Sequence, residues 1–122
     1  MRIETQNSNV VTEEAEVADT FLSKSLGLMF RRSESVPDGY ALVFEFDSEK
    51  KVRLHMVFVF FGIDAVFLDS DNRVVKKTRM EAWTGYVSHE AKRVIETKAG
   101  GLDGVEEGDR LIFRDEDGDR GL

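Results

Sequence analysis

The sequence predicts an α+β fold: a mixed or barrel-like β-sheet of about six or seven short strands, with one short helix near the N-terminus. Three observations support this expectation. Short apolar segments recur along the chain, Gly, Asp and Asn residues separate them, and strands do not alternate with long helices. Since 122 residues, 41% of them hydrophobic, suit one domain, we expect a single globular domain at residues 1–114. Residues 115–122 are predicted to be a disordered acidic tail.

The expected helix lies close to the N-terminus. Its apolar residues follow the spacing i, i+3, i+4 and i+8 of one helix face, at Ala18, Phe21, Leu22 and Leu26. Asp19 or Thr20 is placed to cap its first turn, and Gly27 is placed to end it. We therefore predict a short amphipathic helix at residues 20–26.

The remaining elements are short strands bounded by turns. Pro37 begins a surface loop, and from Tyr40 onward apolar residues alternate with others, as in a half-buried strand. Gly62 breaks a long apolar run, and the polar residues 69–72 form the turn of a predicted hairpin. We expect strands at residues 10–11, 40–47, 51–60, 63–68, 74–75, 93–97 and 111–113.

The charge distribution limits the choice of partner. Of the formal net charge of −7, residues 103–122 contribute eight acids and three bases, a net of −5, and the other residues contribute 16 acids and 14 bases, a net of −2. This balance argues against nucleic acid or an anionic membrane as the main partner. The chain has no cysteine, which excludes disulfides and thiolate chemistry. Without a membrane span or a signal-like N-terminus, we expect a cytoplasmic monomer.

Several short motifs are specific when their order and spacing are taken together. They are Ala18-Asp19-Thr20, the segment from Gly27 to Arg31, Val43-Phe44, His55-Met56, Ile63-Asp64, Phe67-Leu68-Asp69, Val74-Val75, Trp83, Val94-Ile95-Glu96, Ala99-Gly100 and Gly108-Asp109. With these motifs the chain resembles the domain of unknown function 192 family, also called uncharacterised protein family 0127. Many bacterial members have Trp-Met-Lys-Asn-Thr where this chain has residues 55–59, so it resembles the archaeal branch. The resemblance implies a fold and no established activity.

Asp64 is the sharpest candidate for chemistry. It lies in the apolar run 60–68, where an unpaired buried carboxylate would cost several kcal/mol. It is therefore expected to be paired, hydrogen-bonded or facing a pocket, with Arg31 or His55 as the first partners to consider. A purely structural aspartate that accepts hydrogen bonds from loop amides is the commoner explanation of such a residue. In a functional role, Asp64 would be a general base or an anchor for a cationic ligand.

Other residues suggest binding rather than catalysis. Arg31 follows the predicted helix and suits a carboxylate or phosphate ligand, although pairing with Asp64 or Glu96 is the commoner use of such an arginine. Trp83 lies in an irregular segment, where an aromatic side chain either lines a ligand or peptide groove or is buried as a lid over the sheet. A copper site would need His55 with Met29, Met56 and His89, but neighbouring strand residues point to opposite faces. We therefore expect no metal and no cofactor.

These observations leave three hypotheses open. The first is a non-catalytic module that binds a small ligand or a peptide in a pocket formed by Arg31, His55, Asp64, Trp83 and Glu96. The second is a small enzyme, of the hydrolase or isomerase type, that uses Asp64 and His55 as an acid/base pair. The third is a copper-handling protein.

Overall fold

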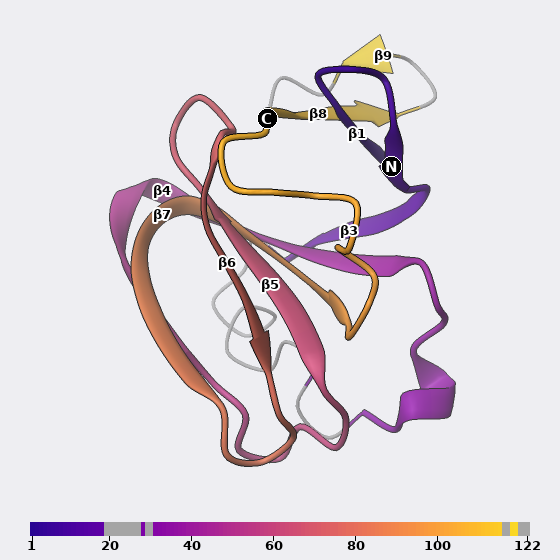
Figure 1. The fold of residues 1–122 in the computed structure, drawn as a ribbon, viewed down its shortest axis with the longest axis vertical. Coiled ribbons are helices and arrows are strands. Elements are labelled where there is room, and N and C mark those ends of the chain that lie inside the picture. Colours follow the sequence, from indigo (N-terminus) through magenta and orange to yellow (C-terminus); the bar gives the residue numbers. More distant parts are fainter. Residues whose placement is uncertain (19–27, 29–30, 116–117, 120–122) are drawn as a thin grey trace.

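The computed structural model describes residues 1–18, 28, 31–115 and 118–119, which form two β-sheets (Figure 1). The larger sheet has the order β3-β4-β7-β5-β6. Its strands are β3 (Glu14–Ala18), β4 (Tyr40–His55), β7 (Tyr86–Lys98), β5 (Ile63–Leu68) and β6 (Val74–Met80). The smaller sheet has the order β2-β1-β8-β9, formed by β2 (Val10–Thr12), β1 (Arg2–Thr5), β8 (Leu111–Asp115) and β9 (Gly118–Asp119).

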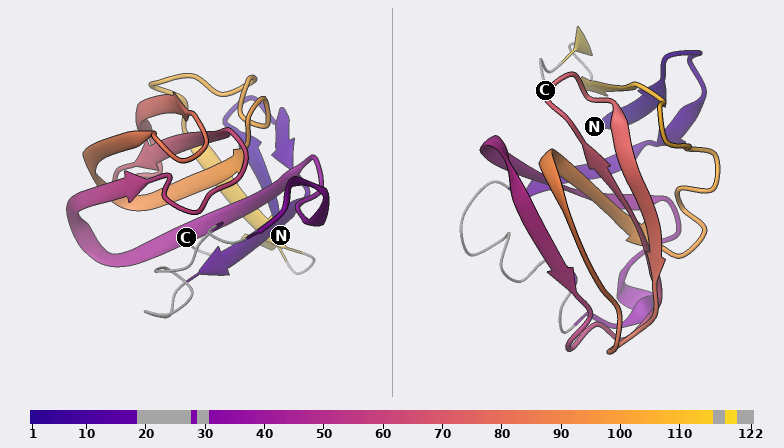
Figure 2. Two further views of the ribbon diagram at one scale, coloured as in Figure 1. Left: turned by 90° about the horizontal axis from the view of Figure 1, so that it is seen from below. Right: turned by 60° about the vertical axis from the view of Figure 1, so that its left-hand side comes forward.

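The larger sheet is mixed, as predicted, because β3 runs parallel to β4 while the other neighbours are antiparallel. It does not close into a barrel. Among the described residues, β3 and β6 are its two edges and do not pair with each other. The barrel-like description is therefore wrong, and an open, strongly curved sheet replaces it (Figure 2).

One long strand replaces two of the predicted ones. β4 has 16 residues, and its pairing with β7 shifts register between Glu45 and Lys50. At this irregularity the antiparallel pair of β4 and β7 bends, so that its outer half curves away from β5 (Figures 1 and 2). The polar residues 47–51 resemble a turn in sequence, but they form the bend of a continuous strand.

Apolar side chains fill both faces of the larger sheet. One face packs against the smaller sheet, where Ile3 of β1 and Phe113 of β8 join Val43, Val66 and Ile95 in one core. The opposite face is covered by a second core, which also includes side chains from the bent half of the β4–β7 pair. Its members include Leu42, Phe44, Val52, Met56, Phe67, Met80 and Val94. This double burial explains why every residue of β5 except Asp64 is apolar.

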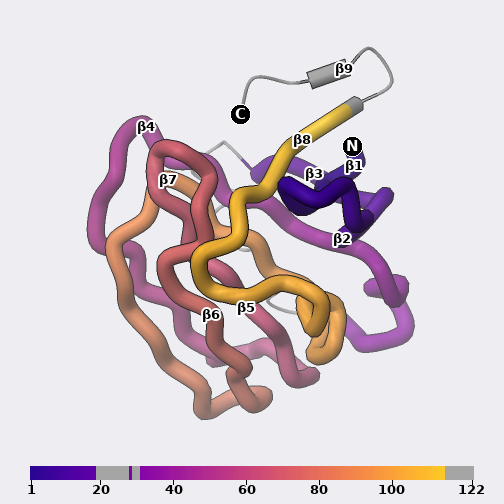
Figure 3. Tube along the Cα trace, turned by 45° about the horizontal axis from the view of Figure 1, so that its top comes forward, coloured from indigo at the N-terminus to yellow at the C-terminus, as the bar shows by residue number. Residues whose placement is uncertain are grey.

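The fold is mostly β rather than α+β. Within the described residues the helical structure is a single 3₁₀ turn at Ser33–Ser35. The predicted helix at residues 20–26 lies outside the described residues. At the other end, β8 includes Asp115 and lies beside the N-terminal strand β1 (Figure 3). On its other side, β8 pairs with the two residues of β9. The division into a domain and a disordered tail stays a prediction. No helix among the described residues is long and apolar enough to cross a membrane.

Candidate interaction site

Asp64 lies on β5 with its side chain almost completely buried. Arg79 on the neighbouring β6 donates to both carboxylate oxygens, from Nε at 2.6 Å and from Nη2 at 3.1 Å. The amides of Gly100 and Leu102 donate to Oδ2 at 2.9 and 3.5 Å. Burial alone would raise the pKa of Asp64, but Arg79 and the two amides outweigh burial and hold that pKa below its usual value.

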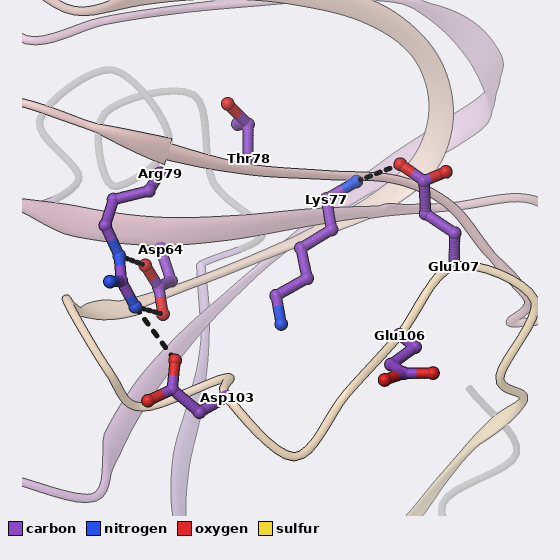
Figure 4. A pocket seen from close by; sticks show the side chains of 7 residues that line it. All are labelled: Asp64, Lys77, Thr78, Arg79, Asp103, Glu106 and Glu107. Atoms are coloured by element: carbon purple, nitrogen blue, oxygen red, sulfur yellow. Dashed lines mark hydrogen bonds and ion pairs between the residues drawn. The ribbon is translucent and has the colours of Figure 1, made fainter.

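The ion pair lies at one side of an open groove of about 650 Å³ between β6 and the loop that follows β7 (Figure 4). Arg79 also binds Asp103 across the groove at 2.8 Å. Farther along, the Lys77 ammonium donates to the Val105 carbonyl at 2.7 Å, while the Lys77 amide donates to the Glu107 carboxylate at 3.1 Å. These bonds tie the loop to the sheet edge. Asp64 thus accepts hydrogen bonds from loop amides, as expected for an aspartate with a structural role, and its charged partner is Arg79.

His55 is not among the hydrogen-bond partners of Asp64 in the described part of the chain. His55 ends β4, its ring is exposed, and its Nδ1 accepts a hydrogen bond from the Val57 amide at 3.2 Å. The strand β7 separates β4 from β5, and His55 pairs with Tyr86 at the opposite end of β7 from the partner of Asp64, Thr97. The acid/base pair required by the enzyme hypothesis is therefore not assembled.

Arg31 and Glu96 also lie apart from Asp64. The guanidinium of Arg31 lies 5.7 Å from the centre of the Tyr40 ring, with Nη1 3.5 Å from the Tyr40 hydroxyl. Glu96 is opposite Ala65 in the sheet, so it faces the side away from Asp64, the residue next to Ala65. The predicted common pocket of Arg31, His55, Asp64, Trp83 and Glu96 is therefore not formed by these residues, and their ligand-binding roles stay predictions.

Glu96, one of the predicted pocket residues, is a buried carboxyl. It lies between Leu42 of β4 and Ala65 of β5, on the face of the sheet that is covered by the second core. Only 6% of its surface is exposed. No described residue makes a hydrogen bond or an ion pair with it. Burial raises the pKa of Glu96 to about 7. Its environment therefore favours the neutral acid.

The residues of the copper hypothesis do not converge. Met56 is fully buried in the core, whereas the adjacent His55 is exposed. The ring of His89 lies 5.9 Å from the ring of Phe67, and Met29 lies outside the described residues. In the described ranges no three His, Asp or Glu side chains are grouped so that they hold a metal ion.

Trp83 belongs to a cluster of exposed apolar residues, which we call the aromatic tip. The tip lies where two loops meet: residues 56–62 between β4 and β5, and residues 81–85 between β6 and β7. Its members and their exposed fractions are Val57 (44%), Phe58 (40%), Phe60 (43%), Trp83 (48%) and Tyr86 (62%). The rings of Phe58 and Phe60 lie 5.4 and 5.5 Å from the Trp83 ring. Exposed aromatic groups of this kind mark interaction sites more often than isolated apolar residues do.

Phe58 occupies a backbone position that favours glycine. The amide of Val59 donates to the carbonyl of Met56 at 3.0 Å, which closes a four-residue turn with Phe58 at its third position. The φ angle of Phe58 is 61°, in the left-handed region that this position of a type II turn requires. A phenylalanine in this region costs about 1 kcal/mol or more relative to glycine. The local backbone therefore does not explain the aromatic ring at this position.

Trp83 is held in a second strained turn. Its φ angle is 70°, and the amide of Thr84 donates to the carbonyl of Ala82 across it at 2.9 Å. This three-residue closure with a positive φ is the classic γ-turn, which is rare and strained. The amide of Trp83 in turn donates to the carbonyl of Val59 at 3.2 Å and joins the two loops. Both loops thus hold an aromatic residue in an unfavourable conformation at the surface.

A glycine allows the two loops to approach. A Cβ atom on Gly85 would lie 2.7 Å from Cβ of Met80 and 2.8 Å from Cγ of Met56, both side chains of the buried core. The carbonyl of Gly85 accepts a hydrogen bond from the Met56 amide at 3.0 Å. Gly85 therefore fixes the tip against the core.

The sequence indicates only part of this site. Trp83 was predicted to lie in an irregular, ligand-lining segment, and it does lie in a loop. Residues 56–60 were predicted to continue a strand because their apolar pattern alternates, but they turn away from the sheet after His55. No Gly, Asn or Pro marks this turn, because Phe58 occupies the position where a turn-forming residue is expected. The alternating pattern alone therefore does not indicate that Phe58 and Phe60 are exposed.

Comparison with known proteins identifies the family. The sequence model of the DUF192 family, described as Uncharacterized ACR, matches residues 2–113. A UPF0127 protein from Thermococcus sibiricus is 36% identical over 122 residues, which cover 96% of this chain and 77% of that protein. A UPF0127 protein from Pyrococcus horikoshii is 37% identical over 84 residues, which cover 67% of this chain and 69% of that protein.

Two crystal structures have a similar fold. A protein of unknown function from Novosphingobium aromaticivorans aligns with a TM-score of 0.76 at 19% identity, covering 93% of this chain and 84% of that chain. A protein from Sinorhizobium meliloti, named as a candidate transcription regulator, aligns with a TM-score of 0.78 at 23% identity, covering 99% of this chain and 92% of that chain. At such identities the likeness concerns the fold alone. On the evidence of the family match and its archaeal relatives, the chain belongs to the DUF192 family of uncharacterised proteins, also named UPF0127.

Proposed function

We propose that this protein is a non-catalytic binding module and that the aromatic tip is its binding surface. The observation that carries the proposal is the pair of strained turns at Phe58 and Trp83. Each turn presents an aromatic ring to solvent at a cost in backbone energy. A surface loop selected for stability alone would place glycine or asparagine at these positions.

The chemistry of the tip suits contact with an apolar partner group. Its rings provide large contact areas, and few side-chain torsions become fixed when they bind. Aromatic side chains are for this reason frequent anchors of interfaces. The ring of Trp83 is flanked by two phenylalanines at centroid distances of 5.4 and 5.5 Å. This packing leaves the cluster rigid in the absence of a partner and lowers the entropy lost on association.

The other ionisable residues support a binding role more than a catalytic one. Asp64 is bonded to Arg79 and to two amides, and His55 is bonded to the amide of Val57. Glu96 is buried in the core-facing side of the sheet. None of the three shares a described hydrogen bond with another of them. The proposal also includes the predicted cytoplasmic location and monomeric state, and it includes a small ligand or a peptide as the partner.

A ligand screen followed by chemical-shift changes tests the proposal. Isotope-labelled protein is titrated with a collection of short peptides and small apolar compounds. We expect bound compounds to shift the indole N–H of Trp83 and the amides of the 56–62 loop. If bound compounds shift only the groove beside Arg79, or if none shifts the Trp83 indole, the proposed surface is wrong.

Two substitutions distinguish binding from folding. Trp83→Ala removes the central ring, and Phe58→Gly removes a ring at a position whose φ of 61° favours glycine. Relief of backbone strain offsets the lost ring contacts in Phe58→Gly, so the fold is retained. We expect both variants to weaken binding about tenfold or more, the loss typical of an aromatic anchor. Val10→Ala is the control, because Val10 is an exposed apolar residue of the smaller sheet.

A further inference from the structure

In the described part of the chain, the outer half of β4 has an edge next to the aromatic tip that no strand covers, and we call it the free edge. On one side, residues Lys50 to His55 pair with β7. On the other side, β3 pairs with β4 only from Tyr40 to Phe44. No described strand pairs with the remaining edge of residues 50–55, which leads directly into the loop of the aromatic tip.

The pairing with β7 determines which backbone groups lie at this edge. The amide of Met56 donates to the carbonyl of Gly85, and His55 is directly opposite Tyr86. In an antiparallel ladder, these two facts show that His55 and Tyr86 are a non-hydrogen-bonded pair. By alternation, the N–H and C=O groups of Lys51, Arg53 and His55 point away from β7 and lie at the free edge.

The side chains of the same residues form a basic row on the outer face. Lys51, Arg53 and His55 are exposed, whereas Val52 between them is buried in the core. Neither Lys51 nor Arg53 forms an ion pair with any described residue. Two such cations therefore lie beside the exposed apolar cluster, with the exposed Glu90 of β7 opposite Lys51 in the register.

We propose that the free edge of β4 binds an extended acidic peptide by strand addition, a proposal that rests on the binding role of the aromatic tip. The peptide runs antiparallel to β4, and its acidic residues lie opposite Lys51 and Arg53. Its alternate residues are apolar and lie beside Val52 and Leu54, which belong to the core or pack against it. The end of the peptide that passes His55 places an apolar side chain on the aromatic tip.

Charge selects this occupant over a second copy of the chain. If two copies paired through this edge about a two-fold axis at Arg53, the two Arg53 side chains would be directly opposite each other. Lys51 would then lie opposite His55 of the other copy. Like charges directly opposite across a strand pair are destabilising. A membrane surface or a nucleic acid lacks the peptide backbone groups that would pair with this strand edge. An acidic peptide forms ion pairs with the two cations and hydrogen bonds with the backbone groups of the edge.

The test uses a blocked peptide that begins with phenylalanine and continues with alternating valine and glutamate. We expect it to shift the amides of Lys51, Arg53 and His55 together with the Trp83 indole. Two exposed ion pairs predict binding about tenfold tighter than that of the same peptide with lysine in place of glutamate. Opposite residues of an antiparallel hydrogen-bonded pair exchange both backbone bonds. Methylation of the glutamate nitrogens should therefore abolish binding, while methylation of the valine nitrogens should retain it.

Charge reversal provides the matched variant. In the double variant with Lys51→Glu and Arg53→Glu, both changed side chains are exposed, so the fold should be retained. We expect this variant to prefer the lysine peptide over the glutamate peptide. Binding that shifts Trp83 but is unaffected by methylation or charge reversal would overturn strand addition and leave the role of the tip intact. Absence of peptide binding, self-association through this edge, or binding only to anionic vesicles or a single-stranded oligonucleotide would overturn the inference.

Discussion

The substitution Glu96→Gln tests the most unusual electrostatic feature of the fold. Glu96 is buried between two strands without a described partner, and burial raises its pKa to about 7 from an ordinary 4.5. The folded state therefore holds the proton more tightly than the unfolded chain does. The stability due to this proton is complete below the unfolded-state pKa and is lost as the pH rises through about 7.

The magnitude follows from the two pKa values. The difference between about 7 and 4.5, at about 1.4 kcal/mol per pH unit, corresponds to about 3 kcal/mol of unfolding free energy. We expect the wild-type protein to lose this amount, relative to Glu96→Gln, between about pH 3.5 and about pH 8, that is, from one unit below the unfolded-state pKa to one unit above the folded-state pKa. Glutamine resembles the neutral acid in shape and does not ionise. The variant should therefore match the wild type at the lower pH and exceed it at the higher pH.

Urea unfolding across this pH range measures the effect. Glu90→Gln is the control, because Glu90 is exposed on the outer face of the same strand. A carbon-13 titration of the Glu96 carboxyl gives the folded-state pKa independently. Parallel stability profiles for the wild type and Glu96→Gln, or a normal titration of Glu96, would refute the assignment of a buried, unpartnered acid.

Two further predictions concern the framework of the site. Asp64→Asn should lower the unfolding free energy by about 1 to 3 kcal/mol at neutral pH, because a buried, multiply bonded acceptor is weakened. Because folding lowers the pKa of Asp64, the stability difference between the wild type and Asp64→Asn should shrink as the pH falls through that pKa. Asp103→Asn is the control, because Asp103 is mostly exposed and its substitution should have little effect on stability at any pH. Gly85→Ala should cost about 1 to 3 kcal/mol in thermal or urea unfolding and shift the Trp83 indole resonance, because the added methyl group meets Met80 and Met56. Gly104→Ala is its control, since nothing lies within 4 Å of the added atom, and equal effects of the two glycine variants would contradict the packing argument.

The strand content was predictable because burial leaves a clear pattern in the sequence. The alternation from Tyr40 onward and the apolar run at residues 63–68 correspond to β4 and β5. The hairpin turn at residues 69–72 connects β5 and β6 as expected. The N-terminal strands were mostly missed. Arg2–Thr5 and Glu14–Ala18 are too short and too charged to show a period, and they are defined by pairing with distant strands.

The candidate site was less predictable, because its geometry depends on contacts far apart in sequence. Arg79 reaches Asp64 only through the pairing of β5 with β6, so Arg31 and His55 were the wrong partners to expect. The exposed position of Phe58 depends on a turn without a turn-forming residue. Trp83 is the predicted site residue that lies in the surface now proposed to bind.

The central claim is that the aromatic tip, and not the charged groove, is the surface that binds. The most direct test is the chemical-shift titration of the wild-type protein and Trp83→Ala with the same set of peptides and compounds. We predict that bound compounds shift the Trp83 indole and the 56–62 loop, and that Trp83→Ala loses their binding. Unchanged binding by Trp83→Ala, with shifts confined to the residues around Asp64 and Arg79, would contradict the claim.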